Sequence, residues 1–459
     1  MAFGGLESHW PVLRLGYGMY FGRTENATVE TALTQTGSAN GDLSFFLRPT
    51  DNLNAGGAPP FPYVLRGQPG SVVKPGVVEF APNFRNPEIH QAVAAVEEEL
   101  PGHVQVTASA LLSLGRRLPI SVDANLGAPT QNITYNVCDQ ISTAPNNGQC
   151  GNSGLGPIKA TQITVPFYAS LPASNCPSGS PLYLAGQLGW CNPNYQQVEE
   201  FTSKANSTYE AAVLRVVRYG RRGLSLHAHY TYAHAVDWNP GESPLDPAAE
   251  FRQEYGTSDL DMRHSAAAMV IYEAPWKLHS LAGQFANGWM MSGIGQFRSG
   301  LPYTMRTSGS LAEEFDGATA IVGLGPGMNG SGGDNRVYGM GSDGRSYNIG
   351  RNTFRYPATW KADMRVGKKF DVGRMRELEL LVESFNLFNH QNVTELETTG
   401  YYLESGTPLG GPGGAATQPT LNFLTGLKAN TTAFGQPLNV NATNFYRERQ
   451  IQIGVRMRF

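Results

Sequence analysis

Residues 451–459 alternate strictly between apolar side chains and polar residues or glycine. The apolar members are Ile451, Ile453, Val455, Met457 and Phe459. Successive side chains of a β-strand point to opposite faces, so this period of two predicts a strand with one wholly apolar face. The same alternation occurs at residues 13–21, 104–113, 224–232 and 360–366, with Leu111 out of phase. The pattern predicts an all-β protein.

Five less regular segments are also expected to be strands: residues 89–98, 208–218, 263–273, 289–298 and 377–385. The segment 88–100 has an alternative as a capped helix, because Asn86 and Pro87 precede it and Gly102 follows it. A strand is favoured there because a short turn at residues 100–102 leads directly into a regular strand. About ten strands are therefore expected.

The connections between these strands alternate between short and long. The short ones are residues 99–102, 219–223, 274–288 and 371–376, and the long ones are 22–88, 114–207, 235–262, 299–359 and 386–446. Transmembrane barrels of the bacterial outer membrane have short periplasmic turns at one rim and long external loops at the other. The chain is therefore expected to be a segment of an antiparallel up-and-down transmembrane β-barrel.

Composition narrows the class of protein further. Only 15% of the residues are charged and the net charge is -3, so a basic surface for nucleic acid is not expected. No run of 18 apolar residues occurs, but transmembrane strands of about 9 to 11 residues need none. The first ten residues have no signal-peptide pattern, so either the chain is not exported or its beginning is missing.

Four cysteines lie in one polar, glycine-rich stretch: Cys138, Cys150, Cys176 and Cys191. Their spacing matches no zinc or redox motif, so disulfides are favoured over free thiols, and disulfides indicate a place outside the cytoplasm. Four cysteines allow three pairings. We expect Cys138 with Cys150 and Cys176 with Cys191, because short loops close at the lowest entropic cost.

Several segments, in their order along the chain, resemble the barrel of Oar-like TonB-dependent transporters. They are Tyr230-Thr231-Tyr232 with Asp237, Asp261-Met262-Arg263-His264, Gly288-Trp289 with Ser292-Gly293-Ile294, Ser299-Gly300-Leu301-Pro302-Tyr303, residues 350–355, residues 367–370 and residues 383–390. The resemblance implies a barrel of 22 strands around an N-terminal plug, with a TonB box and a β-sandwich in front. Residues 1–459 would be the C-terminal part of that barrel, with the plug, the TonB box and the signal peptide absent.

The resemblance also implies a location in the bacterial outer membrane and a set of partners. Phe459 resembles the terminal aromatic residue that the outer-membrane assembly machinery recognises. Lipid would contact Ile451, Ile453, Val455 and Met457. The TonB complex would act only through the missing N-terminal part, and an unknown nutrient would bind the external loops. No nucleic acid and no cofactor is expected.

Three polar groups could be sites, and each also has a structural interpretation. His227 and His229 share a strand face, but a polar barrel lumen explains them without a metal. Asp261, Arg263 and His264 lack a nucleophile or a paired carboxylate, so a polar network at the rim is expected. The last group is expected to form charge pairs across the lumen wall. Its members are Lys361, Asp363, Arg365, Glu377, Glu379 and Glu383.

We therefore expect a receptor and transporter segment, not an enzyme. The alternative is a small porin-like or adhesive protein of the outer membrane, or a secreted β-protein, without TonB coupling. Ten strands are fewer than half of 22, so a curved open sheet is expected, with residues 13–21 and 450–459 as its unpaired edges. The transported substrate is not readable from the sequence.

Overall fold

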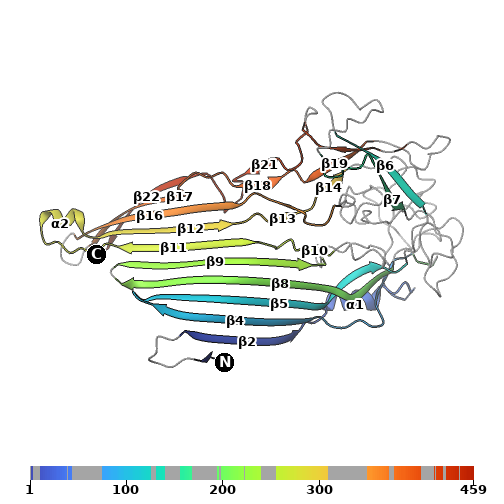
Figure 1. Ribbon diagram of the computed structural model, residues 1–459, viewed down its shortest axis with the longest axis horizontal. Helices are drawn as coiled ribbons and strands as arrows, with labels where there is room; N and C mark the ends of the chain where they lie inside the picture. Colours follow the sequence, from blue (N-terminus) through green and yellow to red (C-terminus); the bar gives the residue numbers. More distant parts are fainter. Residues whose placement is uncertain are drawn as a thin grey trace.

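Ten long strands form the main sheet of the computed structural model (Figure 1). Described residues are 2–3, 11–38, 40–43, 75–125, 131–139, 156–167, 194–195, 198–221, 223–238, 255–308, 349–371, 377–404, 418, 420–426, 431–443 and 445–458. The ten strands are β2 (Val12–Phe21), β4 (Glu88–Leu100), β5 (Val104–Asp123), β8 (Val198–Arg221), β9 (Leu224–Asp237), β11 (His264–Glu273), β12 (Trp289–Arg298), β16 (Thr359–Asp371), β17 (Glu377–Phe385) and β22 (Gln450–Arg458). All ten expected strands are confirmed.

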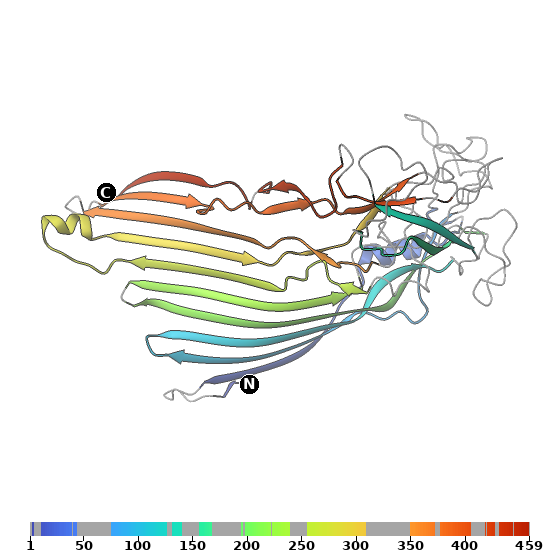
Figure 2. The same cartoon turned by 45° about the horizontal axis from the view of Figure 1, so that its top comes forward.

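The main sheet is antiparallel along these ten strands and open. Its order is β1-β2-β4-β5-β8-β9-β11-β12-β16-β17-β22, where β1 is the short strand Ala2–Phe3. Short strands β3 (Val77–Phe80) and β10 (Gly256–Thr257) add to β8 and β9. Among the described strands no pairing joins β2 to β22, and the two lie on opposite edges of the sheet (Figure 2). The expected open, curved sheet is confirmed.

The segment that could have been a helix is strand β4. All of its residues pair with β5 in an unbroken register from Glu88 opposite Arg116 to Leu100 opposite Val104. The turn between the two strands places Gly102 and His103 at φ values of 89° and 59°. Such left-handed residues match the twist of a tight hairpin. Pairing on both sides of β4 overrides the local helical preference of its alanine and glutamate residues.

The two faces of the main sheet differ in chemistry, as the alternation predicted. Cross-strand partners share a face, and one register row is apolar across five strands. Its members are Leu214, Tyr230, Ala266, Phe297 and Trp360. We call this the apolar face. The opposite, polar face carries ion pairs such as Arg14 with Glu97. Leu111 belongs to the polar face, where it lies opposite Val93.

The long links contain strands of their own, which the sequence analysis did not predict. They emerge at one end of the main sheet, which we call the loop rim; the other end is the turn rim (Figure 1). A five-stranded sheet lies at the loop rim, in the order β14 (Arg306–Ser308), β19 (Thr399–Glu404), β20 (Thr420–Phe423), β6 (Gln131–Asp139) and β7 (Gln162–Phe167). Two more pairs are β13 (Pro302–Tyr303) with β15 (Phe354–Arg355), and β18 (Val393–Leu396) with β21 (Pro437–Val440).

The sheet at the loop rim has a core of its own. Tyr135, Met305, Tyr401 and Leu421 are fully buried. The backbone N–H of Ile158 donates to the Tyr401 hydroxyl at 3.0 Å, and burial raises the pKa of Tyr401 to about 12. Parallel pairing of β20 with β6 joins segments from distant links, so these links form a packed layer at the loop rim. We call the ten long strands of the main sheet the wall.

Two expected boundaries were also wrong. Strands β5 and β8 extend beyond residues 113 and 208, and their register shifts between Gly115 and Leu118, next to Arg117 with its φ of 56°. Such a bulge interrupts the alternation, so the rest of the strand cannot be recognised from a period of two.

The helices in the described part of the chain are α1 (Asn26–Thr34) and α2 (Leu281–Ala286), and α2 lies within the short link 274–288. No helix in the described residues has the length and apolarity of a membrane span.

Candidate functional site at the loop rim

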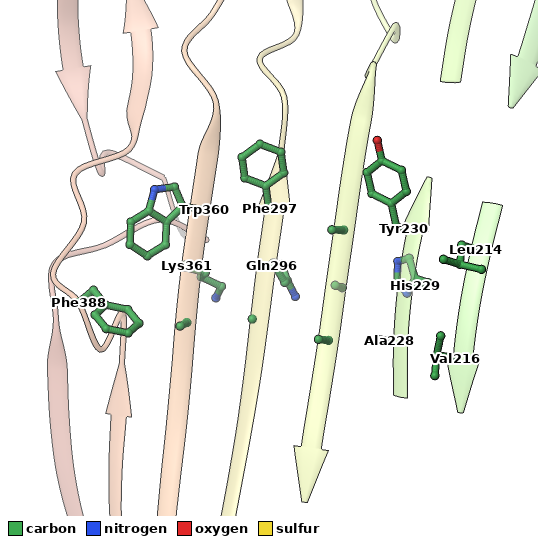
Figure 3. Close-up of a pocket in the computed structure, with 15 residues that line it drawn as sticks. Leu214, Val216, Ala228, His229, Tyr230, Gln296, Phe297, Trp360, Lys361 and Phe388 are labelled. Atoms are coloured by element: carbon green, nitrogen blue, oxygen red, sulfur yellow. The ribbon is translucent and has the colours of Figure 1, made fainter. Parts of the chain in front are cut away.

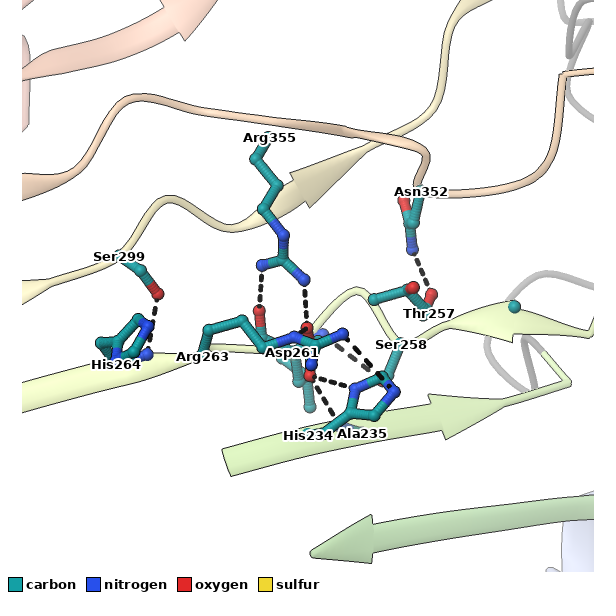
Figure 4. A network of polar contacts seen from close by, with 12 residues as sticks. His234, Ala235, Thr257, Ser258, Asp261, Arg263, His264, Ser299, Asn352 and Arg355 are labelled. Atoms are coloured by element: carbon teal, nitrogen blue, oxygen red, sulfur yellow. Dashed lines mark hydrogen bonds and ion pairs between the residues drawn. The ribbon is translucent and has the colours of Figure 1, made fainter. Parts of the chain in front are cut away.

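A buried carboxylate, Asp261, is the centre of a polar network at the loop rim (Figure 4). Its side chain is fully buried just before β11 and accepts hydrogen bonds from the backbone N–H of Ala235 at 2.6 Å and from Arg263 Nε at 2.9 Å. Arg355 also forms an ion pair with it. His234 Nδ1 lies 3.0 Å from the carboxylate, while Arg263 donates to His234 Nε2 at 3.4 Å. A proton on Nδ1 of His234 would let this ring donate to the carboxylate while Nε2 accepts from Arg263.

The charge of Asp261 is stabilised by its surroundings. Burial opposes ionisation, but the hydrogen bonds from Ala235, His234 and Arg355 and the charge of Arg263 outweigh it and lower the pKa of Asp261 below its ordinary value. The carboxylate is therefore ionised at neutral pH. The polar network expected from Asp261 and Arg263 is confirmed, and the described geometry supplies a structural role for it.

His264 of the same motif takes part through a separate set of contacts. Its backbone N–H donates to Ser299 Oγ at 3.0 Å, and its Nδ1 lies 2.7 Å from the Tyr230 hydroxyl. The ring of His264 also stacks on the Tyr230 ring. These contacts lie on the apolar face, where Tyr232 is the register partner of His264. His264 thus connects the motif to the aromatic residues at the end of the wall.

A second cluster extends the network toward the link between β9 and β11. Arg351 forms ion pairs with Asp237 and, at 3.4 Å, with Asp259. Asn352, whose φ is 56°, donates from Nδ2 to the carbonyl oxygen of Thr257 at 2.8 Å. The root of the link that ends at residue 358 is thereby fixed to the neighbouring link. Arg351 and Arg355 lie in the motif 350–355, but no pattern in the sequence indicated their partners.

A third cluster of asparagines closes the rim next to β16, and the sequence analysis missed it. Asn392 makes two hydrogen bonds with the backbone of Trp360, accepting at 2.8 Å and donating at 3.0 Å. The N–H of Asn392 donates to Asn441 Oδ1 at 2.9 Å. Asn386, with a φ of 50°, donates to the carbonyl oxygen of Arg447 at 2.9 Å. Only the asparagines of the motif 383–390 hinted at this role, because Asn tolerates the left-handed conformation.

The charged residues expected on the polar face are paired, but only one of their pairs joins β16 to β17. Arg365 pairs with Glu383 as expected. Glu379 and Glu377 instead pair with Arg456 at 3.4 Å and with Arg458 at 3.8 Å, because β22 places these arginines directly opposite them. Lys361 and Asp363 pair with each other at 3.3 Å along β16. The charged residues on this part of the polar face therefore form ion pairs with one another.

The histidines of β9 are not part of a metal-binding arrangement in the described structure. His227 packs edge-on against the ring of Tyr219, with 5.5 Å between the centroids. Within the described residues, no group of three or more His, Cys, Asp or Glu side chains is arranged to hold a metal ion. His227 and His229 lie on the polar face, which is the interpretation that required no ligand.

The remaining sequence-predicted residues are only partly covered by the structure. Cys138 is buried in β6 and is disulfide-bonded, but Cys150, Cys176 and Cys191 lie outside the described residues, so the pairing stays a prediction. Phe459 also lies outside them. On β22 the side chains of Ile451, Ile453, Val455 and Met457 are 65%, 78%, 67% and 48% exposed on the apolar face. Their contact with lipid stays a prediction.

A cavity of about 520 Å³ lies on the apolar face and not on the polar one (Figure 3). Its floor is a register row of small residues, and its walls include Leu214, Tyr230, Phe297, Trp360 and Phe388. The row consists of Ala228, Ala268, Gly295 and Ala362. Most of its lining residues are apolar, and the polar residues among them are His229, Gln296 and Lys361.

The chain belongs to the family described as the outer membrane beta barrel domain, which its sequence matches over residues 9–452. It is therefore a protein of the bacterial outer membrane. No curated protein matches the sequence.

Three solved structures are similar to the chain at low identity. The outer membrane transporter YddB from Escherichia coli has 6% identity and a TM-score of 0.39, with 90% of this chain and 38% of that chain covered. FpvA of P. aeruginosa bound to a heterologous pyoverdine has 8% identity and a TM-score of 0.35, with 86% of this chain and 29% of that chain covered. The ferric-catecholate import receptor Fiu from E. coli K12 has 10% identity and a TM-score of 0.34, with 90% of this chain and 32% of that chain covered. The chain spans roughly a third of the length of these proteins.

Proposed function

We propose that the chain forms part of the barrel wall of an Oar-like TonB-dependent receptor, which takes up a nutrient across the outer membrane. The observation that carries this proposal is the loop-rim network around Asp261. Asp261, Arg263 and Arg355 of this network belong to the motifs 261–264 and 350–355, which resemble the Oar-like barrel, and they hold the roots of two long links together. Rigidly held loop roots suit a receptor, because binding loops act best on a fixed scaffold.

The two faces of the wall have separate roles in this proposal. The apolar face contacts the lipid of the outer membrane, and the polar face, with pairs such as Arg365 with Glu383, lines the interior. The packed layer at the loop rim presents the surface that captures the nutrient. The TonB complex acts through a plug that belongs to the intact protein. The protein works by binding and transport, without covalent catalysis and without a cofactor.

The experiment compares growth of the producing bacterium on single nutrients. Cells that lack the gene, or that carry Asp261→Ala, should lose growth on the same nutrient, and cells without a functional TonB complex should lose it too. Asp259→Ala is the matched control, because Asp259 is largely exposed next to the same network. Uptake that persists without TonB would contradict the proposal and would favour a porin-like protein. Adhesion defects without any uptake defect would favour the adhesive alternative.

A further inference from the structure

A lysine lies on the apolar face at the turn rim. Lys368 of β16 is the register partner of Trp289 and of Leu380, and both belong to the apolar face. Only 6% of the surface of Lys368 is exposed. A charge that faces hydrocarbon is unfavourable unless it reaches water or polar partners. Another part of the protein must therefore cover the Lys368 ammonium on the lipid side of the wall and accept its hydrogen bonds.

Helix α2 supplies that cover. Lys368 Nζ donates to the carbonyl oxygen of Gln284 at 2.7 Å and to that of Asn287. These carbonyls lie at the C-terminal end of α2, where a cation is favourable. Trp289 Nε1 donates to the carbonyl oxygen of Phe285 at 2.8 Å, and the Trp289 ring lies 5.5 Å from Lys368 Nζ. Since Lys368 and Trp289 both point out of the apolar face, α2 must lie on that side of the wall.

The link that carries α2 is a defined structure that displays large apolar side chains. Leu278 and Asn287 close its base with two hydrogen bonds of 2.9 Å between the Leu278 backbone and the Asn287 side chain. Ser280 caps α2 by accepting from the N–H of Gly283 at 3.2 Å. Trp276, Leu278 and Phe285 are nonetheless 53%, 55% and 73% exposed. Residues 274–288 contain Lys277 and His279 but no acidic residue.

We propose that the link 274–288 is a membrane foot. It inserts Trp276, Leu278 and Phe285 into the bilayer leaflet next to the turn rim and places Lys277 beside anionic phospholipid headgroups. Aromatic and apolar side chains with basic neighbours are the usual composition of a segment that lies in a membrane interface. The link contains no acidic residue, so the positive charge of Lys277 complements an anionic lipid surface. The foot would fix the depth and tilt of the wall at β12 and β16.

The test uses the protein as the producing cells assemble it, in isolated outer membranes. A nitroxide spin label is attached to Phe285→Cys, and its collisions with oxygen and with a water-soluble nickel chelate are compared. Oxygen concentrates in lipid, so we expect the oxygen collision rate at this position to exceed the nickel rate several-fold. The matched control is Glu99→Cys near the end of β4, on the polar face, where the side chain is 66% exposed and the label should show the reverse order. Labelling of the unaltered chain gives the background from its native cysteines.

One outcome would overturn the membrane insertion, and a second would overturn the contact with anionic headgroups. Nickel collisions in excess of oxygen at position 285 would place the helix in water or against a soluble protein. An unchanged oxygen-to-nickel ratio after Lys277→Glu in the same labelled chain would remove the anionic headgroup from the proposal, since the added negative charge should reduce immersion. Heat-modifiable migration of each variant on a gel verifies that the barrel wall is folded before the collision rates are compared.

Discussion

Arg355 and Asp261 are 94 residues apart in the sequence, yet the Arg355 guanidinium donates both to the Asp261 carboxylate and, at 3.0 Å, to its backbone carbonyl oxygen. A planar guanidinium can hold two acceptors at once, which fixes orientation as well as distance. The two long links that contain these residues therefore cannot move independently at their roots. This contact fixes the described residues before β11 to the described residues before β16.

We expect Asp261→Asn to destabilise the loop rim strongly. The amide keeps the shape of the side chain but leaves the guanidinium groups of Arg263 and Arg355 without their anion. Removal of one partner from a buried ion pair typically costs about 3 kcal/mol or more. The measurement is the temperature at which heat-modifiable migration is lost. Asp259→Asn should change it little, because the Asp259 side chain is 62% exposed and exposed ion pairs contribute about 1 kcal/mol or less.

Acidic pH should loosen the same network. The folded-state pKa of Asp261 lies below its ordinary value, so its stabilising contribution is fully present above about pH 4 and is lost as the pH falls through the lowered pKa. The N–H of Ala235 donates to this carboxylate at 2.6 Å, and its hydrogen-exchange protection factor reports the change. Protection should fall in this acidic range in the natural chain. Protection that falls equally in Asp261→Asn would show that another group is responsible.

We expect Val455→Arg to reduce the yield of protein in the outer membrane far more than Gln452→Arg. Val455 is 67% exposed on the apolar face, and an arginine at mid-bilayer costs about 2 to 4 kcal/mol. Gln452 lies on the polar face, where it hydrogen-bonds to Glu383, so an arginine there gains a carboxylate partner. The measurement is immunodetection in outer-membrane fractions. Equal yields would show that the assignment of the two faces is wrong.

Peptide mapping under non-reducing conditions should find Cys138 joined to Cys150. Cys138 is disulfide-bonded within the buried part of β6, and the shortest loop to another cysteine closes at the lowest entropic cost. Cys176 should then be joined to Cys191. Reduction should release the segment that follows β6 without unfolding the ten-strand wall, which lies in a separate sheet. A peptide that links Cys138 to Cys191 would contradict this pairing.

The strands of the wall could be predicted from sequence because the alternation that indicates a strand lies within the strand itself. The contacts at the loop rim could not, because they join residues far apart in the sequence. Regular strands such as β9 and β22 carry their own alternation, and the period of two places every side chain on a face. The Asp261 motif could be placed at the rim because it directly precedes β11. In contrast, Asn392 and Asn441 are 49 residues apart, and neither belongs to a periodic segment. The short strands β6 and β20 pair in parallel between distant links, and no local pattern encodes such a contact.

The last prediction concerns the two edges of the main sheet. Strand β2 pairs with β4 on one side but only with two residues of β1 on the other, and β22 pairs with β17 alone among the described strands. Unpaired backbone groups cost several kcal/mol each within a bilayer, so the chain alone should neither close a barrel nor transport a solute. Hydrogen exchange of the isolated chain in detergent tests this. Amides of β22 that point away from β17 should exchange rapidly, whereas those of β12, which lies between β11 and β16, should be protected. Uniform protection of β2 and β22 would show that they pair with each other, and the porin-like alternative would then be preferred.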